Sequence, residues 1–366
     1  MACDELHEKG GTWRMNNEIV DLHLNDPQVR KTWEDFLTSL GITDFQSQET
    51  AAIDFTLGIY EGDKLVATGS AAGNVLKYIG VCNKGVDQGS RFNTIVSALI
   101  SRLFQQQVFH LFVFTKLKYS ESFQHVGFHE LAHSDVAALL ETGDSSIDDY
   151  LDAIPRVADQ TNKRVAGIVM NANPFTRGHR FLVEQAASEN DVVYVFVVNT
   201  DASLFTTAER FELVKQGTAD LKNVIVVNGS DYMVSYATFP AYFLPTPDQQ
   251  VDYQTTLDAR IFRDRIAPAL NIKTRYLGTE PLSRTTGIYN QVLQRELPPQ
   301  VAVKIVDRKT TTDGTIVTAT AVRKAIADDQ LDSLAVLLPP STINFINQHL
   351  ESLQFRIKKG MNINGN

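Results

Sequence analysis

Thr176, Gly178 and His179 stand where an apolar run ends and an amphipathic segment begins, in the stretch GIVMNANPFTRGHRFLVEQA. The start of a helix presents unpaired N–H groups and a partial positive charge, so it favours bound phosphate. Gly178 lets the backbone approach a ligand closely. His179, in the first turn, can donate a hydrogen bond to a phosphate oxygen as charge builds there. The residue types and their order therefore predict a phosphate-binding junction between a strand and a helix.

These residues resemble the T/H-x-G-H signature of the nucleotidyltransferase superfamily, whose members form adenylates from ATP and release pyrophosphate. A second stretch, VTATAVRKAI at residues 317–326, resembles the superfamily's I-S-x-S-x-V-R box, with Thr318 and Thr320 in the serine positions. That box caps a helix with hydroxyls and places a cation, here Arg323, against the ATP phosphates; a planar guanidinium suits such contacts. The alternative for the first motif is an ordinary strand–turn–helix connection with a capping threonine and a surface histidine. The alternative for Arg323 is a solvated charge on a helix. Two boxes in one α/β pattern favour the adenylate function.

The chain from Arg164 onward alternates strands with helices. This alternation predicts a Rossmann-like α/β domain, in which a parallel sheet is covered on both faces and binds ligands at the carboxyl ends of its strands. The expected strands cover residues 164–170, 191–199, 223–229, 273–279 and 301–307. The expected helices cover residues 179–189, 208–220, 255–270, 288–297, 319–329 and 340–353. The opening motif follows the first of these strands, where a nucleotide would lie.

The first part of the chain has the order α-β-β-β-α-β-α-β, which resembles the GNAT acetyltransferase fold. That fold binds CoA pyrophosphate with an R/Q-x-x-G-x-G/A loop at a helix N-terminus. In KGVDQGSRFNTIV, Gly89 matches the first glycine, but Val86 stands at the Arg/Gln position and Arg91 at the small-residue position. The expected domains are a GNAT-like domain over residues 1–140, a linker over 141–163 and a nucleotidyltransferase domain over 164–366.

Composition indicates an ordinary globular protein of 366 residues, with 43% hydrophobic and 21% charged residues. A net charge of −9 argues against a general nucleic-acid or membrane-surface binder. Two cysteines and a polar N-terminus favour a reduced, cytoplasmic setting. The stretch HELAH at residues 129–133 has the letters of a zinc-binding helix, but it is expected to be a strand, so no metal site is predicted.

Several longer stretches resemble one family, the citrate (pro-3S)-lyase ligases. They are MNANPFTRGHRFLVEQAA, FTTAERFELVKQG, GSDYMVSYATFPAYFL, RYLGTEP with YNQ, and VTATAVRKAI. The resemblance implies a ligase that converts acetate and ATP into acetyl-AMP and pyrophosphate. The acetyl group then passes to the thiol of the phosphoribosyl-dephospho-CoA prosthetic group on the citrate lyase acyl carrier subunit, which activates the lyase. The GNAT-like domain either holds this CoA derivative or serves only for packing and docking.

The resemblance also assigns roles to single residues. His179, Thr176 and Arg323 are expected to act on the phosphates in catalysis, and Mg²⁺ is expected to accompany ATP, held largely by phosphate and water. The residues expected to bind ATP are Asn171, Asn173, Pro174, Gly178, Arg210, Glu280, Thr318 and Thr320. Arg210 could equally form a salt bridge within its helix instead of binding ATP. Glu280 could equally be an acidic residue of an ordinary turn.

Two other functions fit parts of the pattern. The first is adenylyl transfer to phosphopantetheine or a mononucleotide, which both boxes permit but the long insertions and N-terminal domain disfavour. The second is a GNAT-type acetyltransferase or acyl-CoA sensor. The altered loop around Gly89 disfavours this second function. The first would yield a nucleotide product, and the second would bind acetyl-CoA without releasing pyrophosphate.

Overall fold

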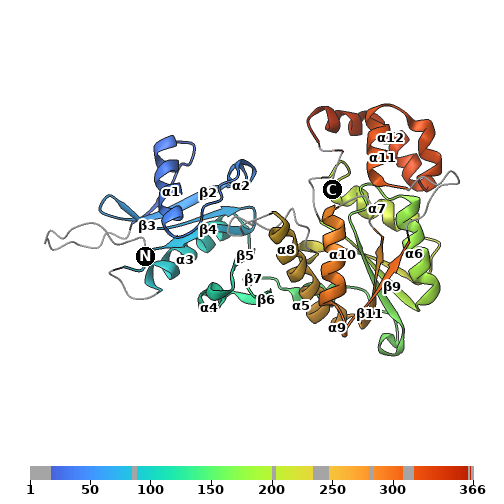
Figure 1. The fold of residues 1–366 in the computed structure, drawn as a ribbon, viewed down its shortest axis with the longest axis horizontal. Helices are drawn as coiled ribbons and strands as arrows, with labels where there is room; N and C mark the ends of the chain where they lie inside the picture. The colour runs from blue at the N-terminus through green and yellow to red at the C-terminus, as the bar shows by residue number, and fades with distance from the viewer. Residues whose placement is uncertain are drawn as a thin grey trace. The chain divides into compact units, whose positions relative to one another are not determined.

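The computed structural model describes residues 18–84, 89–199, 203–233, 247–279, 284–307, 317–361 and 363. The chain divides into two compact units, Met1–Ser146 with Pro240–Gln250 and Ile147–Phe239 with Val251–Asn366 (Figure 1). The division falls within the stretch 141–163 that the sequence assigns to a linker. Residues 141–143 instead complete a strand of the first unit, and a helix beginning at Ile147 belongs to the second.

The first unit is built on a seven-stranded sheet with the order β1-β2-β3-β4-β5-β7-β6. Neighbouring strands run antiparallel, except that β4 and β5 are parallel. Its strands are β1 (Ile19–Asp21), β2 (Phe55–Glu61), β3 (Lys64–Ala72), β4 (Val75–Val81), β5 (His110–Lys116), β6 (His129–His133) and β7 (Ala137–Gly143). The HELAH stretch is thus a strand, as expected.

Helices pack on both faces of this sheet. Helix α3 buries Ile95, Leu99 and Leu103 on one face, because its apolar residues recur three and four apart. Helix α1, which starts at the capping residue Asp26, buries Trp33 and Leu37 on the other. The helices are α1 (Pro27–Ser39), α2 (Ser47–Ala51), α3 (Ser90–Gln105) and α4 (Ser120–Gln124). The α/β order that the sequence predicts is present, with β1 and β7 as additional strands.

The second unit contains a five-stranded, fully parallel sheet with the order β10-β9-β8-β11-β12. All six residues of β9 are buried, as expected for a strand covered on both faces. The strands are β8 (Val165–Met170), β9 (Val192–Val197), β10 (Val224–Asn228), β11 (Ile272–Gly278) and β12 (Ala302–Val306). The predicted parallel sheet is confirmed.

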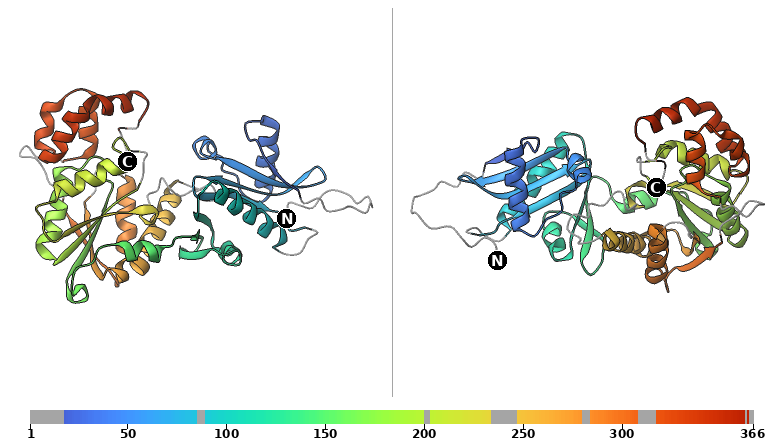
Figure 2. Two further views of the ribbon diagram at one scale, coloured as in Figure 1. Left: turned by 180° about the vertical axis from the view of Figure 1, so that it is seen from behind. Right: turned by 45° about the horizontal axis from the view of Figure 1, so that its top comes forward.

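The chain leaves the central strand β8 in one direction and returns to its other side. Helices α6 and α7 connect β8 to β9 and β9 to β10. Helices α8 and α9 precede β11, α10 connects β11 to β12, and these helices lie on the opposite face of the sheet from α6 and α7 (Figure 2). The helices are α5 (Ile147–Ala153), α6 (Arg177–Glu189), α7 (Thr207–Gly217), α8 (Pro247–Ile261), α9 (Ala267–Ala269), α10 (Arg284–Glu296), α11 (Ala319–Ala327) and α12 (Pro340–Lys358). The switch point of the sheet therefore lies between β8 and β11, where parallel sheets bind ligands.

Candidate active site

The chain turns sharply after β8 and holds Asn173 in the interior. Ala172 has a φ of 51°, and Asn173 is only 2% exposed. The Asn173 side-chain oxygen accepts a hydrogen bond from the Phe205 amide at 3.1 Å, and its backbone carbonyl accepts one from Arg323 at 2.6 Å. Among the described residues, its Nδ2 has no hydrogen-bond partner. A buried donor without an acceptor is costly, so this nitrogen indicates a position for a ligand or a water molecule.

Helix α6 begins with a reciprocal capping box. Thr176 is the N-cap, and its hydroxyl accepts a hydrogen bond from the backbone amide of His179 at 3.3 Å. The His179 ring in turn accepts a hydrogen bond from the backbone amide of Thr176, with 3.1 Å between Nδ1 and the nitrogen. The ring also stacks on the buried Phe175, with ring centroids 5.9 Å apart. The imidazole is therefore fixed in place by two neighbours.

This geometry assigns the proton on the His179 ring. A backbone N–H can only donate, so Nδ1, which faces the amide of Thr176, must act as an acceptor. The ring proton then lies on Nε2, because a neutral imidazole carries one donor and one acceptor nitrogen. His179 can therefore donate a hydrogen bond from Nε2 to an oxygen placed near the start of α6.

Helix α11 provides a second capped N-terminus. Thr318 is its N-cap and accepts a hydrogen bond from the Ala321 amide at 3.2 Å. Arg323, one turn further, is 1% exposed. Its Nη2 donates to the Thr320 hydroxyl at 3.0 Å, and its Nε donates to the Ile363 carbonyl at 3.0 Å. Arg323 is thus a buried cation at the helix start rather than a solvated surface charge.

The two motifs meet at the carboxyl end of β8. A Cβ built on Gly178 would lie 3.4 Å from the carbonyl oxygen of Val317, the residue before the α11 cap. Arg323 of the second motif binds the carbonyl of Asn173 in the first. Two helix N-termini, a histidine N–H donor and a guanidinium are therefore gathered in one place. Such a set of donors and positive dipole ends suits a polyanion.

Arg210 lies in the interior of the unit, between the ends of β8 and β9. It is fully buried, and its guanidinium donates to the carbonyls of Asn171 at 2.8 Å, Val198 at 2.7 Å and Phe205 at 3.1 Å. It also donates to the Asn171 side-chain oxygen at 2.9 Å and the Thr207 hydroxyl at 2.9 Å. A phosphate could reach this guanidinium only by displacing those acceptors. Arg210 fixes the loops that surround the site.

The remaining predicted site residues divide into two groups. Asn171 and Pro174 lie on the turn after β8, where Asn171 is half-buried and Pro174 is buried. Glu280 lies outside the described residues, although Thr279, just before it, follows β11 at the switch point. The side chain of Asn290 holds the end of β11 through a 3.0 Å hydrogen bond to the Gly278 carbonyl.

Sequence reasoning missed the residues that support the histidine from behind. Phe175 packs so closely against Gly217 that a Cβ there would lie 2.4 Å from its ring. The Thr342 hydroxyl, from α12, donates to the Phe175 carbonyl at 2.9 Å. A bidentate ion pair between Arg356 and Glu209, at 2.7 and 2.8 Å, joins α12 to the start of α7. These partners are far apart in the sequence, so no local pattern predicts them.

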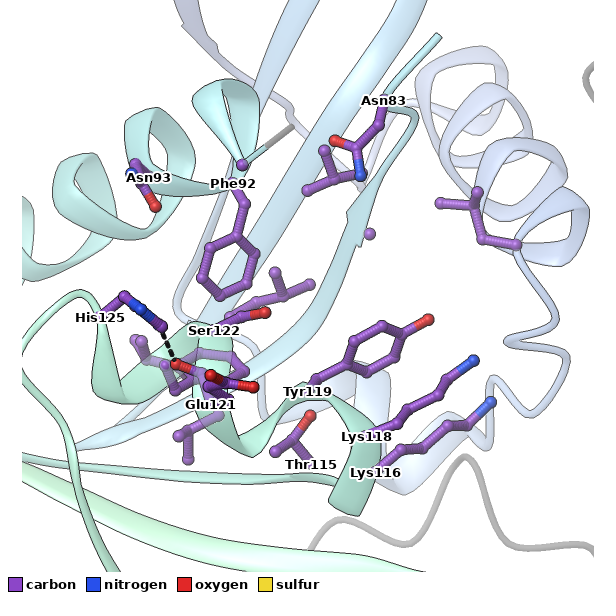
Figure 3. A pocket seen from close by; sticks show the side chains of 18 of the residues that line it. Asn83, Phe92, Asn93, Thr115, Lys116, Lys118, Tyr119, Glu121, Ser122 and His125 are labelled. Carbon is purple, nitrogen blue, oxygen red and sulfur yellow. Dashed lines mark hydrogen bonds between the residues drawn. The ribbon is translucent and has the colours of Figure 1, made fainter. Parts of the chain in front are cut away.

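The first unit contains a separate cavity of about 750 Å³ between β4 and β5 (Figure 3). These strands pair only at Val75–Phe112 and Leu76–Val113, and the cavity lies beyond that point. Its wall includes the apolar side chains of Ile79, Val81 and Phe92. Lys116 and Lys118 line one end and extend in the same direction. The cavity thus has an apolar wall and two lysines among its lining residues.

The start of α3 lies beside this cavity, and Gly89 is among the residues that line it. Arg91 does not face outward but is 2% exposed and pairs with Glu61. It also donates to the carbonyl of Lys84 at 3.1 Å. Gly89 adopts a φ of 86°, which a glycine tolerates readily, and precedes α3. Val86 lies outside the described residues. Arg91 therefore joins the start of α3 to Glu61 and to the Lys84 carbonyl.

In the parts of the chain that the structure describes, no group of three or more histidine, cysteine, aspartate or glutamate residues is arranged to hold a metal ion. Within the same residues, every helix is too short or too polar to cross a bilayer.

Comparisons with known proteins identify relatives of this chain. The profile of the citrate lyase ligase C-terminal domain matches residues 165–346. The citrate (pro-3S)-lyase ligase of Escherichia coli (strain K12) is 33% identical over 85% of this chain and 90% of its own length. That of Klebsiella pneumoniae is 37% identical over 79% of this chain and 85% of its own. A solved N-acetyltransferase from Staphylococcus aureus Mu50 is 15% identical, covers 34% of this chain and 96% of its own, and has a TM-score of 0.27. The similarity to the two ligases extends over most of both chains, and the chain therefore belongs to the citrate lyase ligase family.

Proposed function

We propose that this enzyme activates acetate with ATP and transfers the acetyl group to a thiol on the acyl carrier subunit of citrate lyase. The proposal combines membership of the ligase family with the convergence of the α6 and α11 N-termini around His179 and Arg323. The thiol belongs to the phosphoribosyl-dephospho-CoA prosthetic group of that subunit. Acetylation of this thiol switches the lyase on.

The first step joins acetate to the α-phosphate of ATP. A carboxylate oxygen attacks the α-phosphorus, the bond to the β-phosphate oxygen breaks, and pyrophosphate leaves with the electron pair. Negative charge therefore grows on the leaving oxygens. Donors that are already fixed in place stabilise this charge without reorganising, which is the main contribution that a protein makes to such a step.

The proposed roles follow from the position of each donor. His179 donates from Nε2 to a phosphate oxygen, held in register by Thr176. The backbone around Gly178 and the N-terminus of α11, with Thr318 and Thr320, cradle the phosphates, and Arg323 supplies positive charge. Asn173 offers its Nδ2, which has no hydrogen-bond partner in the described part of the chain, and Pro174 shapes the same turn. Arg210 acts through Asn171, whose side chain and carbonyl it holds.

In the sequence, Glu280 comes two residues after the end of β11, and it is a candidate contact for ATP. Mg²⁺ accompanies ATP and partly neutralises its phosphates. It is held largely by phosphate oxygens and water, as Mg²⁺ commonly is at nucleotide sites.

The second step transfers the acetyl group. The carrier thiolate attacks the acetyl carbon of acetyl-AMP, a carbon–sulfur bond forms, and AMP leaves. We propose that the cavity between β4 and β5 holds the pantetheine portion of the prosthetic group during this step. The two amides of that chain can pair with the open edges of the diverging strands, as an added strand does. Lys116 and Lys118 match its phosphates.

The overall function is tested with the thiol form of the citrate lyase acyl carrier subunit, labelled acetate and Mg·ATP. The proposal predicts label on the carrier, restored citrate cleavage, and AMP and pyrophosphate in equal amounts. Label transfer only from acetyl-CoA would identify a GNAT-type acetyltransferase instead. Formation of dephospho-CoA from phosphopantetheine, or of a dinucleotide from a mononucleotide, would identify an adenylyltransferase.

The role of the cavity is tested separately. Thr115→Trp would fill the opening beside β5, and a Lys116→Ala, Lys118→Ala double variant would remove its charge. Acetyl-AMP formation should stay at the wild-type rate, while the KM for the carrier subunit rises by about tenfold or more. Unchanged transfer kinetics in both variants would leave the first unit a packing or docking domain only.

A further inference from the structure

The buried cation Arg323 binds a backbone carbonyl from the chain beyond α12. Its Nε donates to the carbonyl oxygen of Ile363 at 3.0 Å, across forty positions of sequence. Arg323 also donates to the Asn173 carbonyl and the Thr320 hydroxyl, which belong to the two motifs of the site. The Ile363 carbonyl therefore comes from outside the motifs.

Several contacts direct the chain to this position. Helix α12 ends at Lys358, and Gly360, with a φ of 97°, reverses the chain. The Gly360 amide donates to the Ile357 carbonyl at 2.9 Å, and the Met361 amide donates to the Arg356 carbonyl at 3.2 Å. The Met361 side chain packs against the core cluster of the second unit. The turn therefore fixes Met361 against the core, two residues before Ile363.

We propose that the backbone carbonyl of Ile363 is a built-in competitor for the ATP phosphates at Arg323. This inference rests on the proposed role of Arg323 in binding ATP. The Ile363 carbonyl is one of the acceptors that satisfy this buried guanidinium. A phosphate oxygen carries full charge and accepts a stronger hydrogen bond than a neutral carbonyl. ATP therefore displaces the Ile363 carbonyl, and part of its binding free energy is used for that displacement.

The test measures ATP affinity by calorimetry without acetate, in the full-length chain and in shortened chains. A chain that ends at Met361 keeps the core contact but lacks Ile363. A matched chain that ends at Asn364 keeps the Ile363 peptide carbonyl. Gly360→Val leaves the length unchanged but strains the turn, because β-branched residues avoid positive φ. Hydrogen exchange of the Met361 amide is followed in the full chain as pyrophosphate is added.

We expect the chain ending at Met361 and the Gly360→Val variant to bind ATP about fivefold more tightly than the full chain. The chain ending at Asn364 should match the full chain, and pyrophosphate should speed exchange of the Met361 amide. Equal or weaker ATP binding without Ile363 would overturn the proposal and would make the Ile363 carbonyl a support for Arg323. The calorimetry contains no acetate, so its result does not depend on acetate activation. Tighter ATP binding in calorimetry, together with no acetate-dependent exchange in a separate assay, would contradict the proposed function alone. No ATP binding by any of the chains would overturn both.

Discussion

The backbone nitrogen of Thr176 donates a hydrogen bond to Nδ1 of His179 at 3.1 Å. This bond makes the histidine both a part of the helix cap and an N–H donor, because it leaves the ring proton on Nε2. Structural support and chemistry are thus combined in one side chain. A variant that keeps the cap and removes the ring separates the two roles.

His179→Gln is such a variant. Glutamine at this position of a capping box can accept the same backbone hydrogen bond, so the stability of α6 should be retained. The Nε2–H donor of the ring is lost, and acetate-dependent ATP–pyrophosphate exchange should fall by about a hundredfold or more. Thermal unfolding and exchange are measured on the same preparation. Near-normal exchange in His179→Gln would show that the ring has only the capping role.

Gly217→Ala tests the support behind the histidine. The new methyl would lie 2.4 Å from the ring of Phe175, which is fully buried and cannot retreat. We expect a loss of about 1–3 kcal/mol in unfolding free energy and at least about a tenfold slower exchange, because Phe175 stacks on His179. The control is Gly287→Ala in α10, where a Cβ meets nothing within 4 Å. That change should stabilise the protein by about 0.5–1 kcal/mol.

Arg210→Lys tests a cation that holds the site from inside. A lysine ammonium has three donors and no planar fork, so it cannot satisfy the carbonyls of Asn171, Val198 and Phe205 together. The free energy of unfolding should drop by about 2–3 kcal/mol or more, with a higher KM for ATP. Arg164→Lys, at a surface pair that is 70% exposed on the arginine side, should change stability by less than about 0.5 kcal/mol. Equal behaviour of the two variants would argue against the positioning role.

The Glu209–Arg356 pair gives a pH dependence with a defined sign. Burial alone would raise the pKa of the Glu209 carboxyl, but the Arg356 guanidinium and the Thr206 amide outweigh it and lower that pKa. A lowered pKa adds stability above the unfolded value of about 4.3, and this stability is lost as pH falls through the folded value. Glu209→Gln should therefore cost about 1–2 kcal/mol at pH 7.

Unfolding curves from pH 7 to pH 3 check this expectation. The gap between the wild type and Glu209→Gln should close below about pH 4, as Glu209 of the wild type becomes protonated. Glu184→Gln, which breaks an exposed pair with Arg180, should cost less than about 0.5 kcal/mol over the same range. A gap that stays constant down to pH 3 would mean that the ion pair is not its source.

The positions of both motifs could be predicted from sequence because each depends on local signals. Thr176 and Thr318 are capping residues before amphipathic runs, and the alternation of strands and helices places both at the same edge of a parallel sheet. The contact between Arg323 and Asn173 could not be predicted in the same way. It joins residues 150 positions apart, and its geometry depends on how the last helices pack.

The burial of single charged residues and the presence of short strands are harder to predict from the sequence. Arg210 has the sequence appearance of an exposed helix cation, because a charge in an amphipathic run carries no sign of the carbonyls that surround it. The strand β7 was missed since its apolar run AALL is short and leads into a polar, acidic stretch. Short apolar runs fit a strand or a buried helix turn equally well. Its antiparallel pairing with β5 and β6 is a tertiary property.

The central claim is that the convergence of α6 and α11 forms an acetyl-adenylate site. The most direct measurement is ATP–pyrophosphate exchange in the presence and absence of acetate, for the wild type, His179→Gln and Arg323→Ala. We predict that wild-type exchange requires acetate and that each variant reduces it by about a hundredfold or more. Exchange that ignores acetate but responds to phosphopantetheine or a mononucleotide would contradict the claim and would make the site that of an adenylyltransferase.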